Sequence, residues 1–409
     1  MNKEYHLTKS KTFCMVPWIH LHTSPMGVAA PCCVSESCST VDGMGDSKTQ
    51  PMMDILNATQ MKQLRLDMIN EVPNSECSKC YEQEKVKIRS FRQDMNSIYS
   101  RHYDEALTNT TVEGSINQFK MRYFDIRFSN ICNFKCRTCG SAFSTQWEQE
   151  DLKNNVVYAR IIPKNNNPKF LQEVVEQIQF METAYFAGGE PLITEEHYIL
   201  LEEMIKQGRT NIELRYNTNL SNLKFKDKDL VSLWKHFDKK IEIFASIDHY
   251  GERAEYIRHG TNWGTVENNF LLIKENPHIN LQINTVLSVF NLLTIHDFYQ
   301  YLIDKKLFTV SDRVCTLYNM THPVFLSCHI LPEKYKLKGK ESLQKYIDIL
   351  IQNKFAGKHR NYPDQSIVWL FSNNTWDQHQ TQFRSEIQRI DNLRGEDFNK
   401  TFPELAGLI

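Results

Sequence analysis

The sequence predicts an α/β fold with a parallel sheet, preceded by a cysteine-rich N-terminal domain. Between residues 119 and 330, short segments rich in branched and aromatic residues alternate with segments at helical spacing, which is typical of βα units. Of the 11 cysteines, six lie between positions 14 and 80 and three between 132 and 139. We therefore predict three parts: an N-terminal domain (1–107), a βα domain (119–330) and a helical C-terminal extension (331–409).

The βα domain is predicted to contain six strands. Each is short and rich in branched or aromatic residues, and a polar or glycine turn follows most of them; they span 123–128, 183–187, 212–216, 241–247, 281–287 and 314–318. Helices are predicted at 168–180, 195–207, 265–275 and 295–305. Six such units form either a partial barrel or an open sheet, and the periodicity alone allows both.

Turn and capping residues mark the ends of these helices. Thr194 and Thr294 are predicted N-caps, with Asp297 at the capping-box spacing from Thr294, and Gly208 suits a C-terminal stop. The polar segment 108–118 is predicted to be a linker.

The C-terminal extension changes character. Residues 341–355 predict an amphipathic helix, because apolar residues recur there at helical spacing: Leu343, Tyr346, Ile347, Leu350 and Ile351. Residues 391–405 are expected to pack back on the domain, and we find no chemistry in them.

Composition excludes several functions. Of the 409 residues, 41% are hydrophobic and 24% charged, and 48 Lys and Arg balance 49 Asp and Glu. Such a balance creates no overall field for nucleic acid or an anionic membrane, and no run of about 18 apolar residues predicts a membrane span. The first residues lack an apolar leader, so we expect a cytoplasmic protein whose cysteines serve metal or redox chemistry rather than disulfides.

One loop carries most of the functional information. Cys132, Cys136 and Cys139 lie in SNICNFKCRTCG directly after a predicted strand, and AGGEP begins at Ala187. Three thiolates on one loop can hold three irons of a [4Fe–4S] cluster and leave the fourth iron open for chemistry. The alternative is a zinc site, which usually takes four protein ligands in two CxxC-like pairs.

This loop and the Gly-Gly-Glu turn together resemble the radical S-adenosylmethionine (SAM) enzymes. The resemblance implies a partial (βα)6 radical SAM barrel in which SAM binds the open iron. Reduction then cleaves SAM and yields a 5′-deoxyadenosyl radical that abstracts a substrate hydrogen. The resemblance implies that the three cysteines bind the catalytic cluster. It also implies that Gly188, Gly189 and Glu190 lie at the SAM amino group, where glycines allow close approach and a carboxylate suits a cation.

Two further stretches resemble SAM contacts of the same enzymes. In YNTNLS, the resemblance implies that Asn217, Thr218 and Asn219 bind the ribose, although Leu220 stands where glycine is common.

The second stretch, SIDHYGERAEYIRHG, resembles one found in the peptide- and protein-modifying branch, with His249 in place of a glycine. The resemblance implies that Ser246 and Arg258 hold the SAM carboxylate and that Asp248 lies near the ribose. The alternative for Arg258 is a surface arginine on a solvated helix.

The N-terminal cysteines form two half-sites. Cys14 and Cys32, with Gly27 between them, make one, and Cys77 and Cys80 make the other. Their order resembles the Twitch form of the SPASM/Twitch domains, which bind an auxiliary [4Fe–4S] cluster. Here the domain precedes the barrel, as in a set of phage-associated radical SAM proteins. The alternatives are a cluster with three protein ligands and one open iron, and a zinc ribbon.

Neighbouring cysteines are assigned by geometry. Cys33 is expected to face away from Cys32, because adjacent residues of an extended chain point to opposite sides. Cys38 is expected to bind no metal, and Cys315 and Cys328 are expected in the core.

The predicted substrate is a peptide or protein side chain. The alternatives are a small molecule such as a sugar, aminocyclitol or nucleotide, and an electron carrier without radical turnover. The intact AGGEP argues against the carrier, since a carrier needs no SAM site. A reductant such as flavodoxin or ferredoxin is expected, and the basic run 85–93 is either a solvated face or a surface toward the substrate or that donor.

Overall fold

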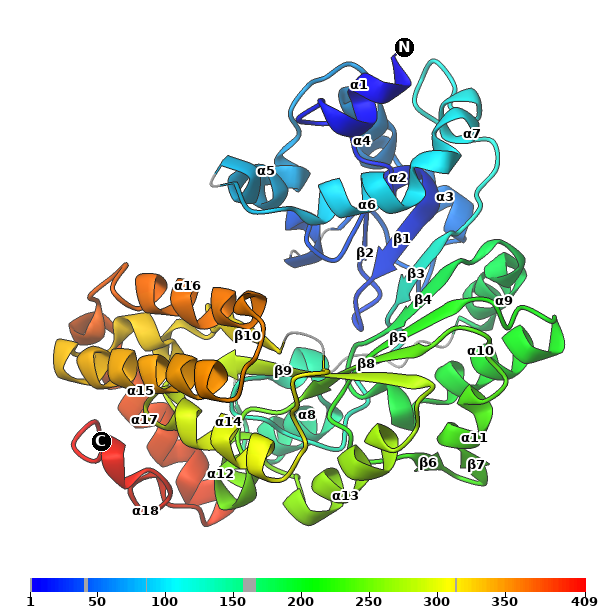
Figure 1. Ribbon diagram of the computed structural model, residues 1–409. Helices are drawn as coiled ribbons and strands as arrows, with labels where there is room; N and C mark the ends of the chain where they lie inside the picture. The colour runs from blue at the N-terminus through cyan, green and yellow to red at the C-terminus, as the bar shows by residue number, and fades with distance from the viewer. Residues whose placement is uncertain (1, 40–42, 86, 157–166, 313–314) are drawn as a thin grey trace.

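The computed structural model describes residues 2–39, 43–85, 87–156, 167–312 and 315–409. It contains an eight-stranded sheet with the order β10-β9-β8-β5-β4-β3-β1-β2 (Figure 1). Six neighbouring strands are parallel and follow one another in chain order. They are β3 (Tyr123–Ile126), β4 (Thr183–Phe186), β5 (Glu213–Thr218), β8 (Ile241–Ser246), β9 (Ile279–Leu287) and β10 (Thr316–Asn319).

The strand order decides between the two folds that the sequence allowed. A doubly wound open sheet reverses its strand order near the middle, whereas a barrel adds each strand on the same side of the previous one. The six strands run in one direction without reversal, so the domain is a partial (βα)6 barrel. All six predicted strands are confirmed, apart from position 314, which lies outside the described residues.

The predicted barrel helices are also confirmed. They are α9 (Pro168–Gln177), α10 (Glu195–Lys206), α13 (Trp263–Lys274) and α14 (Ile295–Asp304); α8 (Thr145–Lys153), α11 (Leu230–Trp234) and α12 (Gly251–Ile257) complete the set around the described strands. Gly208 follows α10 with φ +66° and ends it as predicted.

Thr194 and Thr294 occupy the N-cap positions as predicted, but neither side chain makes a capping hydrogen bond to its helix. The Thr194 hydroxyl donates to the Pro191 carbonyl at 2.9 Å, and the Thr294 hydroxyl accepts from Arg253 Nη1 at 2.8 Å. Each hydroxyl is therefore used by a neighbour, which local sequence spacing does not reveal.

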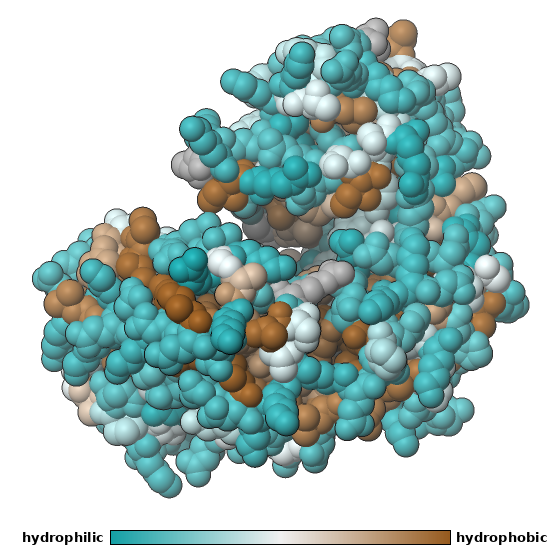
Figure 2. Space-filling view, viewed as in Figure 1, coloured by the Kyte–Doolittle hydropathy of each residue, from teal (hydrophilic) through white to brown (hydrophobic). Residues whose placement is uncertain are grey.

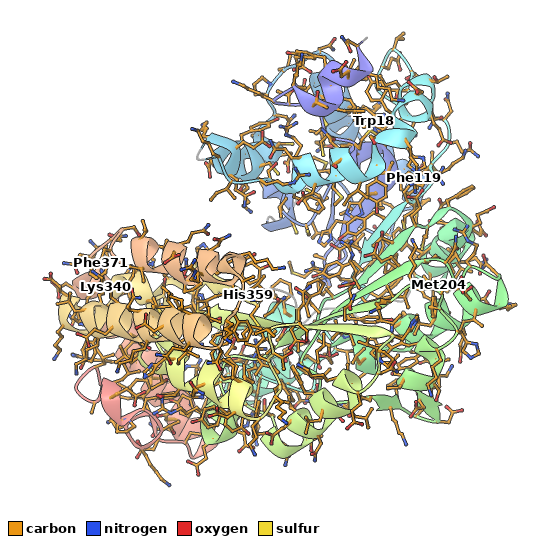
Figure 3. All side chains as sticks on the ribbon, viewed as in Figure 1. Trp18, Phe119, Met204, Lys340, His359 and Phe371 are labelled. Carbon is orange, nitrogen blue, oxygen red and sulfur yellow. The ribbon has the colours of Figure 1, made fainter. Side chains whose placement is uncertain are left out.

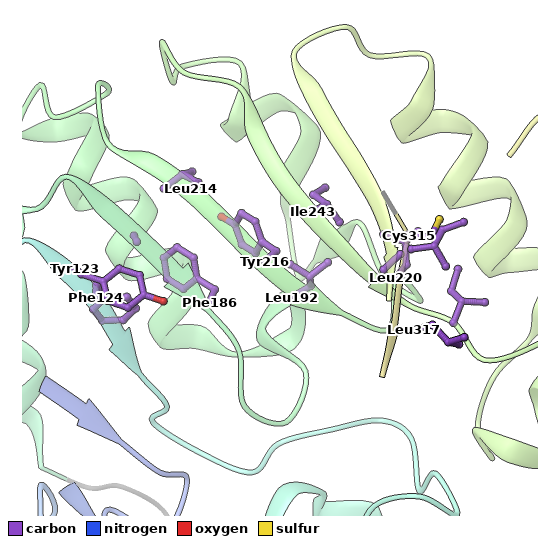
Figure 4. Packing of buried hydrophobic residues seen from close by; sticks show 14 of the residues in the cluster. Tyr123, Phe124, Phe186, Leu192, Leu214, Tyr216, Leu220, Ile243, Cys315 and Leu317 are labelled. Atoms are coloured by element: carbon purple, nitrogen blue, oxygen red, sulfur yellow. The ribbon is translucent and has the colours of Figure 1, made fainter. Parts of the chain in front are cut away.

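The sheet has an apolar and a polar face. Phe186, Leu214, Tyr216 and Ile243 lie on the apolar face (Figure 4), and the Phe186 and Tyr216 rings stack with centroids 5.1 Å apart. Burial of such side chains contributes about 1.5–3 kcal/mol each. The alternate residues of β5, Glu213, Arg215 and Asn217, are half-buried and face the opposite side. This polar face is the one available to a ligand.

The N-terminal domain shares the barrel's sheet. Its helices are α1 (Lys3–Thr8), α2 (Val16–Ile19), α3 (Met52–Leu56), α4 (Thr59–Ile69), α5 (Ser78–Lys85), α6 (Phe91–Tyr99) and α7 (Tyr103–Thr108). Strand β1 (His20–Thr23) pairs in parallel with β3 and in antiparallel with β2 (Ala29–Ala30). The domain therefore covers the β3 edge of the barrel, and Trp18 and Phe119 lie in this part of the molecule (Figure 3).

The segment 108–118 is not a free linker. Ile116 is buried, Arg65 Nη1 donates to the Gly114 carbonyl at 3.0 Å, and Trp18 Nε1 donates to Thr110 Oγ1 at 2.7 Å. Its polar groups bond to the N-terminal domain, so it is part of that domain's surface.

The C-terminal extension is helical, as predicted. Its helices are α15 (Glu333–Gln352), α16 (Asn361–Leu370), α17 (Trp376–Arg394) and α18 (Phe398–Thr401), and α15 packs on α14. Four of the five predicted apolar positions of α15 are buried, but Ile351 is 52% exposed. None of the helices in the described ranges is long and apolar enough to cross a membrane.

Candidate iron–sulfur and cofactor sites

The three-cysteine loop follows β3 and is held by the chain after α12. Lys135 N donates to the His259 carbonyl at 2.9 Å, and Arg137 N donates to the Ile257 carbonyl at 2.8 Å. Gly260 has φ +106°, and a Cβ there would lie 2.9 Å from a loop carbonyl oxygen. The loop's backbone is therefore fixed by a segment about 120 residues away.

The three thiols have different surroundings. Cys132 Sγ accepts from Phe134 N at 3.4 Å, and the nearly buried Cys136 Sγ lies 3.9 Å from Arg258 Nη1. Cys139 is exposed. Burial raises the pKa of Cys136 to about 12 and the pKa of Cys132 in the same direction, so thiolates here require positive charge such as iron. Phe134 is buried, as expected of a side chain that shields a cluster.

The Gly-Gly-Glu turn lies against this loop. Glu190 N donates to the Ile131 carbonyl at 2.7 Å, and a Cβ on Gly189 would come within 2.2 Å of the same oxygen. Gly188 has φ +131°, a conformation that L side chains rarely adopt. Both glycines are therefore required by the backbone at this turn.

The Glu190 carboxylate is buried and hydrogen-bonded within the protein. It is 1% exposed and accepts hydrogen bonds from Thr218 Oγ1 (2.7 Å), Asn219 N (2.7 Å) and Leu192 N (3.1 Å). Burial raises its pKa to about 7. The carboxylate thus joins the turn after β4 to the end of β5, and only the backbone of the turn remains for a cofactor amino group.

The end of β5 contacts the cysteine loop. Asn219 Nδ2 donates to Asn133 Oδ1 at 3.0 Å, and Asn133 Nδ2 donates to Ser221 Oγ at 2.9 Å. Leu220 has φ +59°, so the turn keeps the conformation that favours glycine although the residue is leucine. Asn217 Oδ1 is buried without a hydrogen-bond partner, which leaves an acceptor for a ligand hydroxyl.

Asp248 and Arg258 form one unit. Arg258 Nε lies 2.8 Å from Asp248 Oδ2, and Asp248 Oδ1 accepts from Val286 N at 2.8 Å. Burial opposes the charge on Arg258, but Asp248 and Cys136 together raise its pKa. Arg258 is therefore not a surface arginine: it lies between a carboxylate and a predicted cluster ligand. Ser246 ends β8 and is half-buried.

The four N-terminal cysteines are brought together. Cys14, Cys32, Cys77 and Cys80 line one pocket. Burial raises the pKa of each thiol, and the Cys77 pKa reaches about 12.

The residues around this pocket follow the predicted pattern. Cys33 is not among the lining residues; its thiol interacts with Asp125 and Arg127 on the barrel side. Gly27 has φ +89°, and a Cβ there would meet Asp46 Oδ1 at 2.5 Å, so the spacing glycine is required by its turn. Cys315 and Cys328 lie in the core, as predicted.

The described side chains include no ready single-ion site. No three His, Cys, Asp or Glu residues of the described ranges are arranged to hold one metal ion. A zinc ion requires its ligands within about 2.3 Å of one point, whereas a cluster distributes its cysteines over several irons.

Two charged segments make contacts with the rest of the fold. In the basic run 85–93, Arg92 is buried and its Nη1 donates to the Phe13 carbonyl at 2.7 Å, so it is not part of a solvated charge surface. Residues 391–405 pack back on the domain as predicted, because Asp391, Arg394 and Glu396 contact residues of the cysteine loop or of α8. No local motif marks these side chains, and only the fold brings them to the loop.

Known proteins match part of the chain. Residues 14–81 match the SPASM iron–sulfur cluster-binding domain family, a range that begins at Cys14 and ends one residue after Cys80. No curated protein sequence matches the chain. The matched range includes all four cysteines that line the N-terminal pocket.

Several solved structures are similar at a distance. His6-tagged anSMEcpe with bound AdoMet is 16% identical, with a TM-score of 0.41, over 57% of this chain and 59% of that chain. Streptococcus suis SuiB bound to precursor peptide SuiA is 14% identical, with a TM-score of 0.39, over 77% and 64%. TYW1 with a lysine-pyruvate adduct is 14% identical, with a TM-score of 0.30, over 57% and 71%. The chain thus spans about three-fifths of the anSMEcpe chain, and these likenesses do not assign an activity.

Proposed function

We propose that this protein is a radical SAM enzyme. Cys132, Cys136 and Cys139 would hold the SAM-binding [4Fe–4S] cluster, and the four N-terminal cysteines would hold an auxiliary Twitch-type [4Fe–4S] cluster. The observation that carries the proposal is convergence on the cysteine loop. The Gly-Gly-Glu turn, the end of β5 and Arg258, from three distant parts of the sequence, all contact it.

The residues around the loop fit SAM. When bound to the reduced cluster, SAM supplies a 5′-deoxyadenosyl radical. The chain's own residues would position it: backbone carbonyls of the Gly188–Gly189 turn would bind its amino group, and Arg258, beside Cys136, would bind its carboxylate. Asn217, Thr218, Asn219, Ser246 and Asp248 would bind the ribose from the strand ends. Phe134, which is buried, would exclude water from the cluster.

The polar face of the barrel would bind the substrate. The strand register brings four polar side chains into one row across the sheet: Tyr185, Arg215, Glu242 and Asn280. Figure 2 shows a hollow between the N-terminal domain and the C-terminal helices. We propose that a peptide or protein side chain binds there. A small polar molecule is the second candidate, because the same row offers many hydrogen-bonding groups.

The auxiliary cluster would exchange electrons with the substrate radical or with a reductant such as flavodoxin or ferredoxin in the cytoplasm. A closed set of four cysteines favours electron transfer over substrate binding. A pure electron carrier remains the rival function, and it requires no SAM cleavage.

Anaerobic reconstitution tests the proposal. With dithionite and SAM, we expect 5′-deoxyadenosine from the wild-type protein and none from Cys136→Ala, while the core variant Cys315→Ala retains activity. Two clusters correspond to about eight irons per chain, and Cys77→Ala should retain about four. A wild-type protein that binds iron but yields no 5′-deoxyadenosine would support the carrier instead.

A further inference from the structure

Two basic residues of the cysteine loop point away from the predicted cluster. Lys135 and Arg137 flank Cys136, and both backbones pair with the segment 257–259. Side chains alternate along such an extended segment. The two cations are therefore directed to the opposite side from the Cys136 thiol, toward α8 and α17.

The guanidinium group of Arg137 lies in a buried site to which the C-terminal extension contributes. Its side chain is 1% exposed and its Nη2 lies 2.5 Å from Asp391 Oδ1, with Glu396 as a second partner. The guanidinium lies 3.7 Å from the centroid of the Tyr256 ring, and the Tyr256 hydroxyl donates to Asp391 at 2.8 Å. Two carboxylates thus surround one cation that has no access to water.

Lys135 is linked to α17 through Glu150 of α8. Glu150 pairs with Lys135 and accepts from Arg394 Nη2 at 2.8 Å. Arg394 lies 4.5 Å from the centroid of the Trp147 ring, and Trp147 Nε1 donates to the Cys136 carbonyl at 2.7 Å. A chain of contacts therefore runs from α17 to the backbone of the central cysteine.

A third contact holds the segment that pairs with the loop. His259 Nδ1 lies 2.5 Å from Glu396 Oε1, and Asp391 Oδ2 accepts from Phe398 N at 2.8 Å. Gly395, with φ +65°, ends α17 between these residues. The turn allows Asp391, Arg394 and Glu396 to act on the loop together.

We propose that Asp391, Arg394 and Glu396 are positioning residues for the SAM-binding cluster. They hold the loop's backbone so that its three thiols keep the spacing that a cubane needs. A buried cation stripped of its partners is strongly unfavourable, so removing the carboxylates should displace Arg137 and the loop with it. This inference rests on the proposed function, since it assumes a cluster at the three cysteines.

The double variant Asp391→Asn/Glu396→Gln tests the proposal, because it removes both charges and keeps the side-chain shapes. We expect the chain to fold and its N-terminal cluster to remain. Iron from the SAM-binding cluster should pass to a chelator at least tenfold faster, and SAM should no longer change that cluster's electron paramagnetic resonance signal. The matched control is Glu386→Gln, which breaks the half-buried Arg389–Glu386 pair on the same helix and should match the wild type.

A second variant guards against misfolding. Arg137→Lys keeps the charge but loses the planar guanidinium that lies over the Tyr256 ring, and we expect an intermediate rate of iron loss. Wild-type chelation rates and spectra in both variants would overturn the positioning role. Absence of 5′-deoxyadenosine from the wild type would instead contradict the proposed function, while the chelation rates would still report whether α17 holds the cluster loop.

Discussion

At the scale of single residues, the candidate site depends on close approach between backbones. Gly189 has no side chain because the carbonyl of Ile131 occupies the space where a Cβ would be. The sequence identified this glycine through its motif, with cofactor access as the reason. The structure adds a second reason, because the turn must touch the cysteine loop for Glu190 N to donate to the same carbonyl.

Gly189→Ala should therefore displace the cysteine loop. A Cβ at 2.2 Å from a backbone oxygen forces the loop or the turn to move, so we expect at least a tenfold fall in 5′-deoxyadenosine formation, or about 1.4 kcal/mol. Gly140→Ala is the control, since a Cβ there meets nothing within 4 Å and its backbone is extended. Equal activity in the two variants would contradict this account.

At the scale of elements, the turn after β5 shows why a sequence mismatch can mislead. Leucine at position 220 weakened the predicted resemblance, because glycine is common there. The structure nevertheless places Leu220 at φ +59°, and its side chain is completely buried. Packing of that side chain offsets the backbone strain. A sequence motif does not show this, because it contains no information about how the side chain packs.

Two substitutions at this turn should reverse the usual order of stability. Leu220→Ala removes a buried side chain and keeps the strain, so it should cost about 3 kcal/mol. Leu220→Gly removes the same side chain but relieves about 1–2 kcal/mol of left-handed strain. We expect the glycine variant to be at least as stable as the alanine variant in urea unfolding. A glycine variant clearly less stable than alanine would show that the conformation is not strained.

At the scale of the whole molecule, the sequence predicted the local units but not their long-range partners. The six strands and the cysteine half-sites are defined by patterns that span only a few residues, so the sequence predicted them. Arg137 and Asp391 are 254 positions apart, and nothing near either one marks the pair. The parallel pairing of β1 with β3 was missed for the same reason, because only the assembled fold shows that the N-terminal domain completes the barrel's sheet.

An ion pair between β1 and β3 makes the stability of this junction depend on pH. His22 of β1 and Asp125 of β3 are directly opposite in the register, both fully buried, with His22 Nδ1 3.0 Å from Asp125 Oδ2. Burial alone would lower the pKa of His22, but Asp125 raises it to about 9. An unfolded histidine titrates near 6.5, so this contribution to stability is complete below about pH 6.5 and is lost as pH rises through about 9.

Raising the pH from 7 to 10 should therefore lower the free energy of unfolding more in the wild type than in His22→Gln. The control is His20→Gln on the same strand: His20 is equally buried, but burial lowers its pKa to about 4, so it is neutral at both pH values. Urea unfolding of the three proteins at each pH measures the difference. If His22→Gln kept the full wild-type loss between pH 7 and 10, the pair would not stabilise the junction. A smaller loss confined to His22→Gln would assign that part of the junction's stability to the charged imidazole.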